Sequence, residues 1–554
     1  MIETNFIKLY EKSFRENWDL PAFTDLSETT TTTYGEFAKR IVRLHILFEE
    51  MGIKKKDKVV LIGRNHTAWA SIFMASITYG AVVVPILHEF HPDSMENIIL
   101  HSDAKLIFID ENTLKKLNID RFTHPVITFP NWVVVNRQNS ETDCLETTID
   151  KKFAKKHPNG FHPSDIQYPR IHNDTVICLN YTSGTTGFSK GVMLTANNYA
   201  GNVVFAEKLN LLLKGESIVA FLPMAHAYGC AFDFLYALSA GVHIHLIGKN
   251  MSPSILLDAF KQVKPKLIIT VPLILEKIYQ KKLLPVISKP VTQSMLKVPI
   301  LRNVIYSKIR KTLIASLGGE LKEIIVGGAA MSKEAESFLY KVGLPFTIGY
   351  GMTECAPLIS YDSHRDFVPN SCGRVLEGIM EARIDSNEPT KTPGEIQVRG
   401  ENVMKGYYKN PSATDAAFTD DGWLRTGDLG ILDNENRLYI KGRIKTMLLG
   451  ANGQNIFPEE IEARLNNMPY VAENLIIKRD NRLVALVYPD IHEMKETDVS
   501  FEQLESIMNN NRLLMNEKLA AFEQIGYIEI RKEEFEKTPK KSIKRFLYLE
   551  DNGK

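Results

Sequence analysis

Apolar residues at helical and at strand spacing alternate through the first part of the chain. Helical spacing covers residues 34–50, and the short apolar run at residues 58–63 then predicts a buried strand. Similar runs recur with helical segments between them, as at residues 105–110 and 266–270. Strands that alternate with helices predict βαβ units and a mostly parallel sheet covered by helices.

The uncharged stretch at residues 67–87 is about long enough to cross a bilayer. Polar residues interrupt it, and Gly80 and Pro85 divide it into a helical part and a β-branched part. The pattern therefore predicts a buried helix followed by a buried strand.

After about Gly373 the pattern changes to short strands with Gly, Asn and Asp turns, as at residues 394–400 and 433–440, which is typical of antiparallel β-structure. The end of the chain returns to mixed helices and strands. We therefore expect an α/β protein with a large N-terminal domain of βαβ layers plus a β-barrel-like part, and a small α+β C-terminal domain.

Composition and charge limit the number of domains, the kinds of partner and the compartment that we expect. With 554 residues we expect at least two domains. The chain has 67 basic and 66 acidic residues, so no overall field attracts nucleic acid, and we expect no nucleic-acid partner. Five cysteines without Cys-x-x-Cys spacing and a beginning without a secretory signal predict a cytoplasmic protein.

Residues 281–318 are unusual because they hold lysines and arginines and no acidic residue. One interpretation, which we favour from the sequence, is a solvated insertion. The other is an amphipathic element that rests on anionic lipid, which would make the protein peripheral at a membrane.

Hydroxyl side chains and glycines fill a short loop, residues 181–191, between two predicted strands. Gly184 and Gly187 allow backbone N–H groups to converge on an anion, and Lys190 supplies a positive charge. The spacing differs from a Walker A loop, so the loop by itself predicts only a nucleotide. The short hydroxyl donors are Thr182, Ser183, Thr185 and Thr186.

Together with the motif at residues 349–354 and the glycines at 327–328, this loop resembles that of the adenylate-forming superfamily. This superfamily comprises acyl-CoA synthetases, firefly-type luciferases and nonribosomal peptide adenylation domains. The resemblance covers nearly the whole chain, with Ser189 departing from the usual proline. It implies that ATP and Mg²⁺ are used to activate a carboxylic acid as its acyl-AMP.

The resemblance also implies roles for the residues of these motifs. Tyr350 would stack on adenine, Thr353 would bind the α-phosphate and Glu354 would hold Mg²⁺. A third motif at residues 422–430 implies that Asp428 accepts hydrogen bonds from the ribose hydroxyls, with Arg443 alongside. Gly328, Ala329 and Gly351 complete the expected nucleotide site, and His226 would lie beside the reacting carboxylate.

In relatives the N-terminal domain ends just after the ribose arginine and the C-terminal domain rotates between two half-reactions. The resemblance thus implies domains 1–444 and 445–554 with a hinge at Lys445 or Thr446. Residues 449–462 resemble the segment that lines the pantetheine tunnel, which makes Gly450 and Gly453 the expected coenzyme A contacts.

Ser542 stands where relatives have the lysine that grips the carboxylate in adenylation. Lys541 is the neighbouring candidate, although adjacent side chains on a regular strand point to opposite faces. We therefore expect Lys541 to be the catalytic lysine, which requires that the backbone around it is locally irregular.

The overall layout, including the basic segment and residues 407–411, resembles most closely the long-chain fatty acyl-CoA synthetases. This resemblance implies that a medium- or long-chain fatty acid is activated and transferred to coenzyme A. Two alternatives remain: a ligase that loads an aryl or acyl group on a carrier protein, and a non-catalytic nucleotide- or acyl-binding protein.

Overall fold

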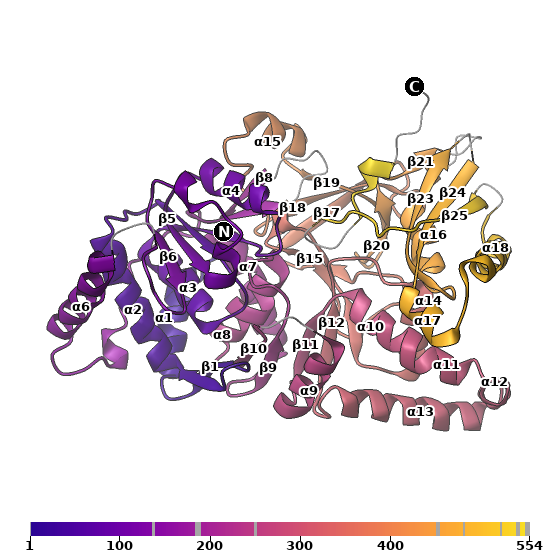
Figure 1. Ribbon diagram of the computed structural model, residues 1–554, viewed down its shortest axis with the longest axis horizontal. Coiled ribbons are helices and arrows are strands. Elements are labelled where there is room, and N and C mark those ends of the chain that lie inside the picture. The colour runs from indigo at the N-terminus through magenta and orange to yellow at the C-terminus, as the bar shows by residue number, and fades with distance from the viewer. Residues whose placement is uncertain are drawn as a thin grey trace.

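The computed structural model describes residues 2–135, 139–182, 190–248, 252–449, 455–479, 482–520, 523–538 and 543–548; for 139–146, 449 and 455 it describes the backbone only. Helices and short sheets of the first half lie at the left of Figure 1, and the last part of the chain lies at the right. An antiparallel sheet lies between them.

A six-stranded sheet forms the centre of the first half, in the order β6-β5-β3-β4-β7-β8. All neighbouring strands are parallel except β7 and β8, which confirms the predicted mostly parallel sheet. The strands are β3 Lys58–Ile62, β4 Val82–Ile86, β5 Ala104–Asp110, β6 Val126–Phe129, β7 Val176–Thr182 and β8 Lys190–Thr195.

The uncharged stretch at residues 67–87 forms helix α3 (Thr67–Tyr79) and strand β4, as predicted. Residues 67–78 of α3 are all buried, because α3 packs between α2 (Tyr34–Glu50) and the sheet. None of the helices within the described ranges is long and apolar enough to cross a membrane.

Two further sheets extend this half. One has the order β2-β1-β10-β9 and the other is the parallel sheet β11-β12-β13. Their edges bring segments that are distant in the sequence into one body, and a continuous apolar core runs through all of them. The strands are β1 Pro21–Asp25, β2 Thr30–Thr33, β9 Ser217–Ala220, β10 His243–Leu246, β11 Leu267–Thr270, β12 Glu323–Val326 and β13 Phe346–Ile348.

The expected antiparallel part consists of a three-stranded sheet, β14-β15-β16, and a four-stranded sheet, β17-β18-β19-β20. The turn between β19 and β20 forms because Asp433 accepts from two backbone N–H groups and Asn436 adopts φ +59°. The strands are β14 Tyr350–Gly351, β15 Leu358–Tyr361, β16 Arg374–Val375, β17 Met380–Asp385, β18 Gly394–Gly400, β19 Leu424–Leu432 and β20 Leu438–Arg443.

The last part of the chain has apolar clusters of its own. The large core ends at Leu438, with Ile440 packed against it, and the next cluster begins with Leu448 and Ile456. The domain boundary at 444/445 falls between these cores and stays a prediction. The elements are β21 Leu448–Leu449, β22 Asn455–Ile456, α16 Pro458–Leu465, β23 Val471–Arg479, β24 Arg482–Pro489, α17 Ile491–Thr497, α18 Phe501–Asn516 and β25 Ile525–Ile530.

The helices of residues 6–417 pack on these sheets or lie at the edge of the molecule. They are α1 Phe6–Glu16, α4 Pro92–His101, α5 Glu111–Leu114, α6 Asn139–Lys156, α7 Ala196–Leu209, α8 Ala237–Ser239, α9 Pro253–Val263, α10 Pro272–Ile278, α11 Leu284–Ile287, α12 Pro290–Leu296, α13 Pro299–Ser316, α14 Lys333–Val342 and α15 Pro411–Ala417. Two π-helices, Gly229–Tyr236 and Tyr279–Leu283, and 3₁₀ turns, among them Thr353–Cys355 and Arg545–Tyr548, complete the described elements.

Candidate functional site

The predicted phosphate loop is the connection between β7 and β8. Thr182 at the end of β7 is the register partner of Lys190 at the start of β8, so the two ends of the loop lie side by side. The sequence predicted that the first strand ends near Leu179 and the second begins near Val192. The pairing of β7 with β8 instead continues to Thr182 and Lys190, which makes the loop shorter. The other expected loop residues, Ser183, Gly184, Thr185, Thr186 and Gly187, lie outside the described residues.

Lys190 lies over an aromatic ring that also reaches the predicted magnesium ligand. Its Nζ is 4.7 Å from the ring centroid of Tyr407, and the Tyr407 hydroxyl donates to Glu354 Oε1 at 2.9 Å. Burial, followed by the nearby Glu354 carboxylate, raises the pKa of Tyr407, which therefore stays a neutral donor. One tyrosine thus links the loop lysine to the carboxylate.

Backbone pairing fixes this arrangement. Tyr407 forms a bridge with Val192 of β8, and the Gly191 carbonyl accepts from the Tyr408 N–H at 2.7 Å. The Met404 N–H donates to the Glu354 carbonyl at 2.7 Å. Sequence reasoning named residues 407–411 only as a feature of layout and missed Tyr407 as a site residue.

Thr353 and Glu354 lie on a 3₁₀ turn that follows β14. Thr353 is buried and Glu354 is half-buried. Oε2, the second carboxylate oxygen of Glu354, forms no hydrogen bond or ion pair with the described residues. A carboxylate oxygen of this kind suits Mg²⁺, which usually takes one or two protein carboxylates and completes its shell with substrate phosphates and water.

Tyr350, Asp428 and Arg443 converge from three strands. The Tyr350 hydroxyl donates to Asp428 Oδ2 at 2.7 Å, and Arg443 Nε lies 3.2 Å from Asp428 Oδ1. Asp428 and Arg443 are register partners on β19 and β20, so the hairpin holds the ion pair in place. The structure therefore joins Tyr350 of the second motif to Asp428 and Arg443 of the third in one cluster.

The Asp428 carboxyl is buried, whereas the Arg443 side chain is 68% exposed. Burial raises the pKa of Asp428, while Arg443 and Tyr350 oppose that rise. Each carboxylate oxygen has two lone pairs, so Asp428 keeps acceptor capacity beside these contacts. Glu459 of α16 acts on the pKa of Asp428 from the C-terminal part, and sequence reasoning did not single it out.

Gly351 follows Tyr350 directly on β14, and the other expected residues of this set, Gly328 and Ala329, follow β12. Gly328 has φ +86°, which favours glycine, whereas Ala329 is exposed. Gly351 leaves no room for a side chain, because an added Cβ would lie 2.2 Å from the Pro357 carbonyl oxygen. His226 precedes the π-helix Gly229–Tyr236, and its Nδ1 accepts from the Tyr228 N–H at 3.3 Å.

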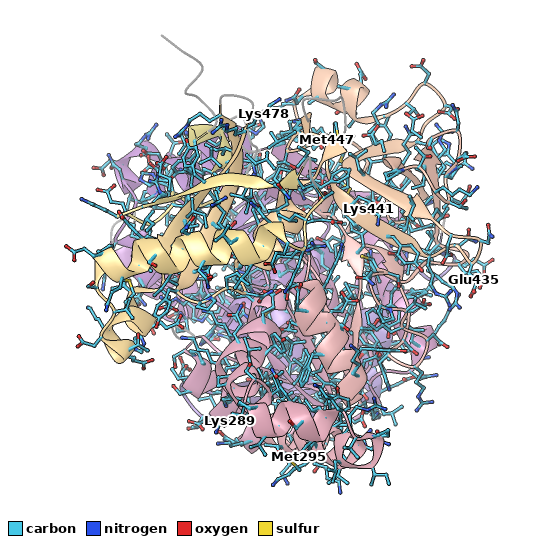
Figure 2. All side chains as sticks on the ribbon, turned by 90° about the vertical axis from the view of Figure 1, so that its right-hand side faces the viewer. Lys289, Met295, Glu435, Lys441, Met447 and Lys478 are labelled. Carbon is cyan, nitrogen blue, oxygen red and sulfur yellow. The ribbon has the colours of Figure 1, made fainter. Side chains whose placement is uncertain are left out.

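The expected hinge is a turn just after β20. Lys445 is exposed, and the Thr446 hydroxyl donates to the Arg443 carbonyl at 3.1 Å. Figure 2 shows Lys441 and Met447, on either side of this turn, where the antiparallel sheet meets the last part of the chain. Gly450, Gly453, Lys541 and Ser542 lie outside the described residues, and the flanking Lys537 and Ile543 form an antiparallel bridge.

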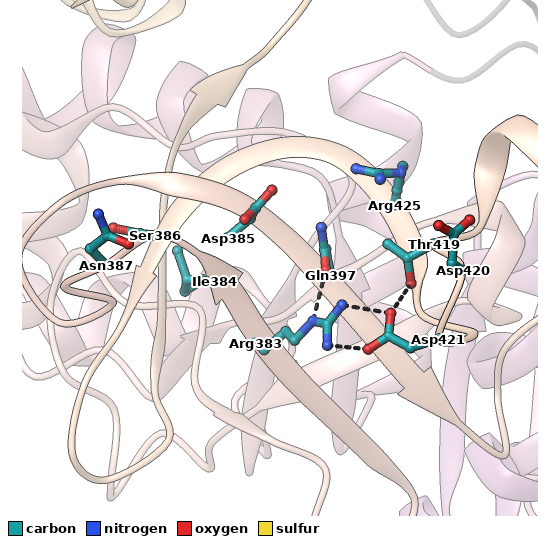
Figure 3. A pocket seen from close by; sticks show the side chains of 10 residues that line it. All are labelled: Arg383, Ile384, Asp385, Ser386, Asn387, Gln397, Thr419, Asp420, Asp421 and Arg425. Atoms are coloured by element: carbon teal, nitrogen blue, oxygen red, sulfur yellow. Dashed lines mark hydrogen bonds and ion pairs between the residues drawn. The ribbon is translucent and has the colours of Figure 1, made fainter.

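A surface hollow of about 590 Å³ lies on the antiparallel sheet, away from these residues. Figure 3 shows Arg383 in this hollow, where it binds Asp421 at 2.6 and 2.9 Å and Gln397 at 2.8 Å. Because the guanidinium is already paired and none of the expected site residues lines the hollow, we do not assign the site to it.

Solved structures share this fold. ATP-bound MatB from Rhodopseudomonas palustris superposes with a TM-score of 0.74 at 21% identity, covering 98% of both chains. The o-succinylbenzoate coenzyme A synthetase of Bacillus subtilis, solved with ATP and magnesium, gives a TM-score of 0.72 at 20% identity, again over 98% of both chains. The expected α/β fold, with a large first part and a smaller last part, is confirmed.

Sequence relatives agree with the fold. Long chain acyl-CoA synthetase 7 of Arabidopsis thaliana is 28% identical over 527 residues, covering 88% of this chain and 73% of its own. The 4-coumarate:CoA ligase 1 of Petunia hybrida is 27% identical over 461 residues, covering 80% of this chain and 76% of its own. The family model described as AMP-binding enzyme matches residues 10–408, and the chain therefore belongs to the AMP-binding enzyme family.

Proposed function

We propose that the protein is an acid–thiol ligase that activates a medium- or long-chain fatty acid with ATP and transfers the acyl group to coenzyme A. The observation that carries this proposal is a pair of clusters, Lys190–Tyr407–Glu354 and Tyr350–Asp428–Arg443, which the motif at residues 349–354 connects through the chain. The first has the groups that suit a polyphosphate with Mg²⁺, and the second those that suit a ribose diol.

In the proposed first step a carboxylate oxygen of the acid attacks the α-phosphorus of ATP, and the bond to pyrophosphate breaks. Lys190 and the loop amides offset the phosphate charge, and Thr353 binds the α-phosphate. Mg²⁺ held by Glu354 would supply charge neutralisation at the phosphate oxygens. Asp428 and Arg443 orient the nucleotide through its ribose, with Tyr350 beside the adenine.

In the proposed second step the thiol sulfur of coenzyme A attacks the acyl carbon, the bond to AMP breaks and the thiol proton passes to solvent. Gly450 and Gly453 are the proposed coenzyme A contacts, and rotation at Lys445 and Thr446 would exchange the two active arrangements. His226 and Lys541 are proposed to act on the carboxylate. Each of these assignments rests on the motif resemblance.

The names of several relatives support a fatty acid. The FadD15 protein of Mycobacterium bovis, called a long-chain-fatty-acid–CoA ligase, is 25% identical over 487 residues. The coumarate ligase of similar identity supports an aryl acid as the second candidate. A substrate panel separates the two, since the pocket for the acyl group determines which acid reacts.

The proposal is tested by ATP–pyrophosphate exchange with a panel of fatty, aryl and amino acids. We expect exchange with a fatty acid in the wild type and its loss in Lys190→Ala and Lys541→Ala. Lys151→Ala, which changes an exposed lysine on α6, is the matched control and should retain exchange.

Exchange that persists in Lys541→Ala would mean that a residue other than Lys541 is the adenylation lysine. Absence of exchange with every acid would contradict the proposed activity and favour a non-catalytic binding protein. The acceptor is tested by mass spectrometry of the product with coenzyme A and with a holo-acyl carrier protein. We expect acyl-coenzyme A, and acylation of the carrier protein alone would contradict that acceptor.

A further inference from the structure

The basic segment folds into α11, α12 and α13, which form the lower right edge of the molecule in Figure 1. Figure 2 places Lys289 and Met295 of this segment at the lower edge in that view, far from Met447 and Lys478. The segment is thus a protruding helical corner at the periphery of the fold.

Large apolar side chains are exposed at this corner. Ile300 is 76% exposed, Val291 72% and Val304 62%. Val298 between the two helices is exposed as well, as are Met295 and Leu301. We call Val291, Met295, Val298, Ile300, Leu301 and Val304 the apolar corner. A concentration of this kind is unusual for a free protein surface and marks an interaction site.

The rest of α13 explains why these residues face outward. Leu313 and Leu317, at and just after the C-terminal end of the helix, are buried, and Tyr306 packs edge-on against Phe338 of α14 with centroids 6.0 Å apart. The helix therefore attaches to the core from Tyr306 to its C-terminal end. Its first residues, which include Ile300 and Val304, lie before this contact, and neither side chain belongs to the large apolar core of the described residues.

Cations surround the apolar corner. Lys289, Lys297, Arg302 and Lys308 are exposed, and within the described ranges none of them forms an ion pair. No acidic residue occurs between Glu276 and Glu320. The segment thus has apolar side chains at its tip and basic side chains beside them, and Glu493 of α17 is close enough to interact with Lys281 at the other end of the segment.

We infer that the apolar corner inserts into the surface of a membrane rich in anionic lipid. Apolar side chains that enter the acyl boundary and cations that meet lipid phosphates are the two components of interfacial binding. No described helix can span a bilayer, so the contact is peripheral. The inference is independent of the proposed ligase activity.

The test is vesicle co-sedimentation of the full chain without ATP. We expect binding to vesicles of equal parts phosphatidylglycerol and phosphatidylcholine and much weaker binding to pure phosphatidylcholine. Binding should fall with added NaCl, because the Debye length shrinks to about 3 Å at 1 M salt. No binding to the anionic vesicles at low salt would overturn the inference.

Two variants assign the binding to the corner. Ile300→Ser with Val304→Ser should weaken it at least about tenfold, from the lost burial of two branched side chains. Lys297→Glu with Arg302→Glu should weaken it at least about thirtyfold, because two cations that face the anionic surface are lost and two like charges replace them. The control, Leu213→Ser with Lys151→Glu, changes an exposed leucine and an exposed lysine elsewhere and should bind normally.

Circular dichroism should show all variants folded, and pyrophosphate exchange with a water-soluble acid should be unchanged where the ligase activity is present. Unaltered vesicle binding in both corner variants would overturn the inference. The same is true of a wild-type dimer in sedimentation velocity that the Ile300→Ser and Val304→Ser variant dissociates, since a second copy would then cover the corner.

Discussion

At the scale of single residues, Tyr407 stands out because it touches both sides of the proposed phosphate site. Its ring lies under Lys190 and its hydroxyl donates to Glu354. The ring orients the Lys190 ammonium and the hydroxyl orients the Glu354 carboxylate. One side chain thus fixes the positions of both charged groups. This suggests that Tyr407 is a positioning residue for nucleotide and metal.

Tyr407→Phe should lower kcat/KM for pyrophosphate exchange about tenfold and raise the Mg²⁺ concentration needed for half-maximal exchange. The reason is the loss of a hydrogen bond to a carboxylate, worth about 1.5–3 kcal/mol, while the ring on Lys190 is kept. Exchange kinetics across a Mg²⁺ titration measure both effects.

The matched control is Tyr408→Phe, which removes the neighbouring hydroxyl from its 2.9 Å hydrogen bond to Asp103 and should leave exchange unchanged. Equal effects of the two substitutions would contradict a specific role of Tyr407.

At the scale of elements, α14 has a buried carboxyl in its first turn. Glu336 is 4% exposed and accepts a hydrogen bond from the Asn370 N–H, and burial raises its pKa from 4.5 to about 6. A carboxyl with a raised folded-state pKa is tolerated best in its protonated form. Stability from this group is therefore fully present below about pH 4.5 and is lost as the pH rises through about 6.

At neutral pH the raised pKa of Glu336 corresponds to a loss of about 2 kcal/mol in the free energy of unfolding. Glu336→Gln should therefore gain about 1 kcal/mol over the wild type when the pH rises from 5 to 7.5. Urea unfolding at the two pH values measures the difference. Glu334→Gln, on the exposed side of the same helix, should show no such gain, and a parallel pH dependence in all three proteins would disprove the assignment.

At the scale of the whole molecule, two cores meet at the turn that holds Lys445, and polar contacts connect them elsewhere. Lys333 of α14 pairs with Glu460 of α16 at 3.0 Å, and Gln280 donates to the Asn467 side chain at 2.7 Å. Half-exposed contacts of this kind are each weak, which supports the proposed rotation of the last part relative to the first.

Lys445→Pro should impair one half-reaction at least about tenfold more than the other, because proline fixes φ in a segment that has to change its backbone angles. Pyrophosphate exchange reports adenylation, and transfer from isolated acyl-AMP to coenzyme A reports the second step. Lys445→Ala is the control that removes the charge and keeps the backbone free. Equal loss of both steps in the proline variant would argue against rotation.

Lys333→Glu should increase tryptic cleavage after Lys445 about two- to fivefold, since loss of an exposed ion pair is worth up to about 1 kcal/mol. Adding Glu460→Lys should restore the wild-type rate, because the pair is re-formed with reversed signs. Mass spectrometry of the fragments follows the cleavage. Lys341→Glu on the same helix is the control, and failure of the double variant to recover would exclude a direct role of this pair.

Much of the fold and of the candidate site could be predicted from the sequence, because the signals are local. Hydrophobic periodicity located α2, α3 and β3 closely, and a turn rich in Asp and Asn marked the β19–β20 hairpin. The motifs that contain Lys190, Glu354 and Asp428 predicted the candidate nucleotide site, since each motif has its own spacing along the chain. Spacing and period are properties of neighbouring residues.

The remaining features depend on contacts between distant segments. The position of Tyr407 between Lys190 and Glu354 follows from the pairing of β8 with a segment far along the chain. The exposure of Ile300 and Val304 follows from where α13 leaves the core. The sequence by itself determined which residues carry charge and which segments have the period of a helix or a strand. Tertiary structure decided which charged side chains lie together and which apolar side chains face outward, because contacts between distant segments and burial are set by the whole fold.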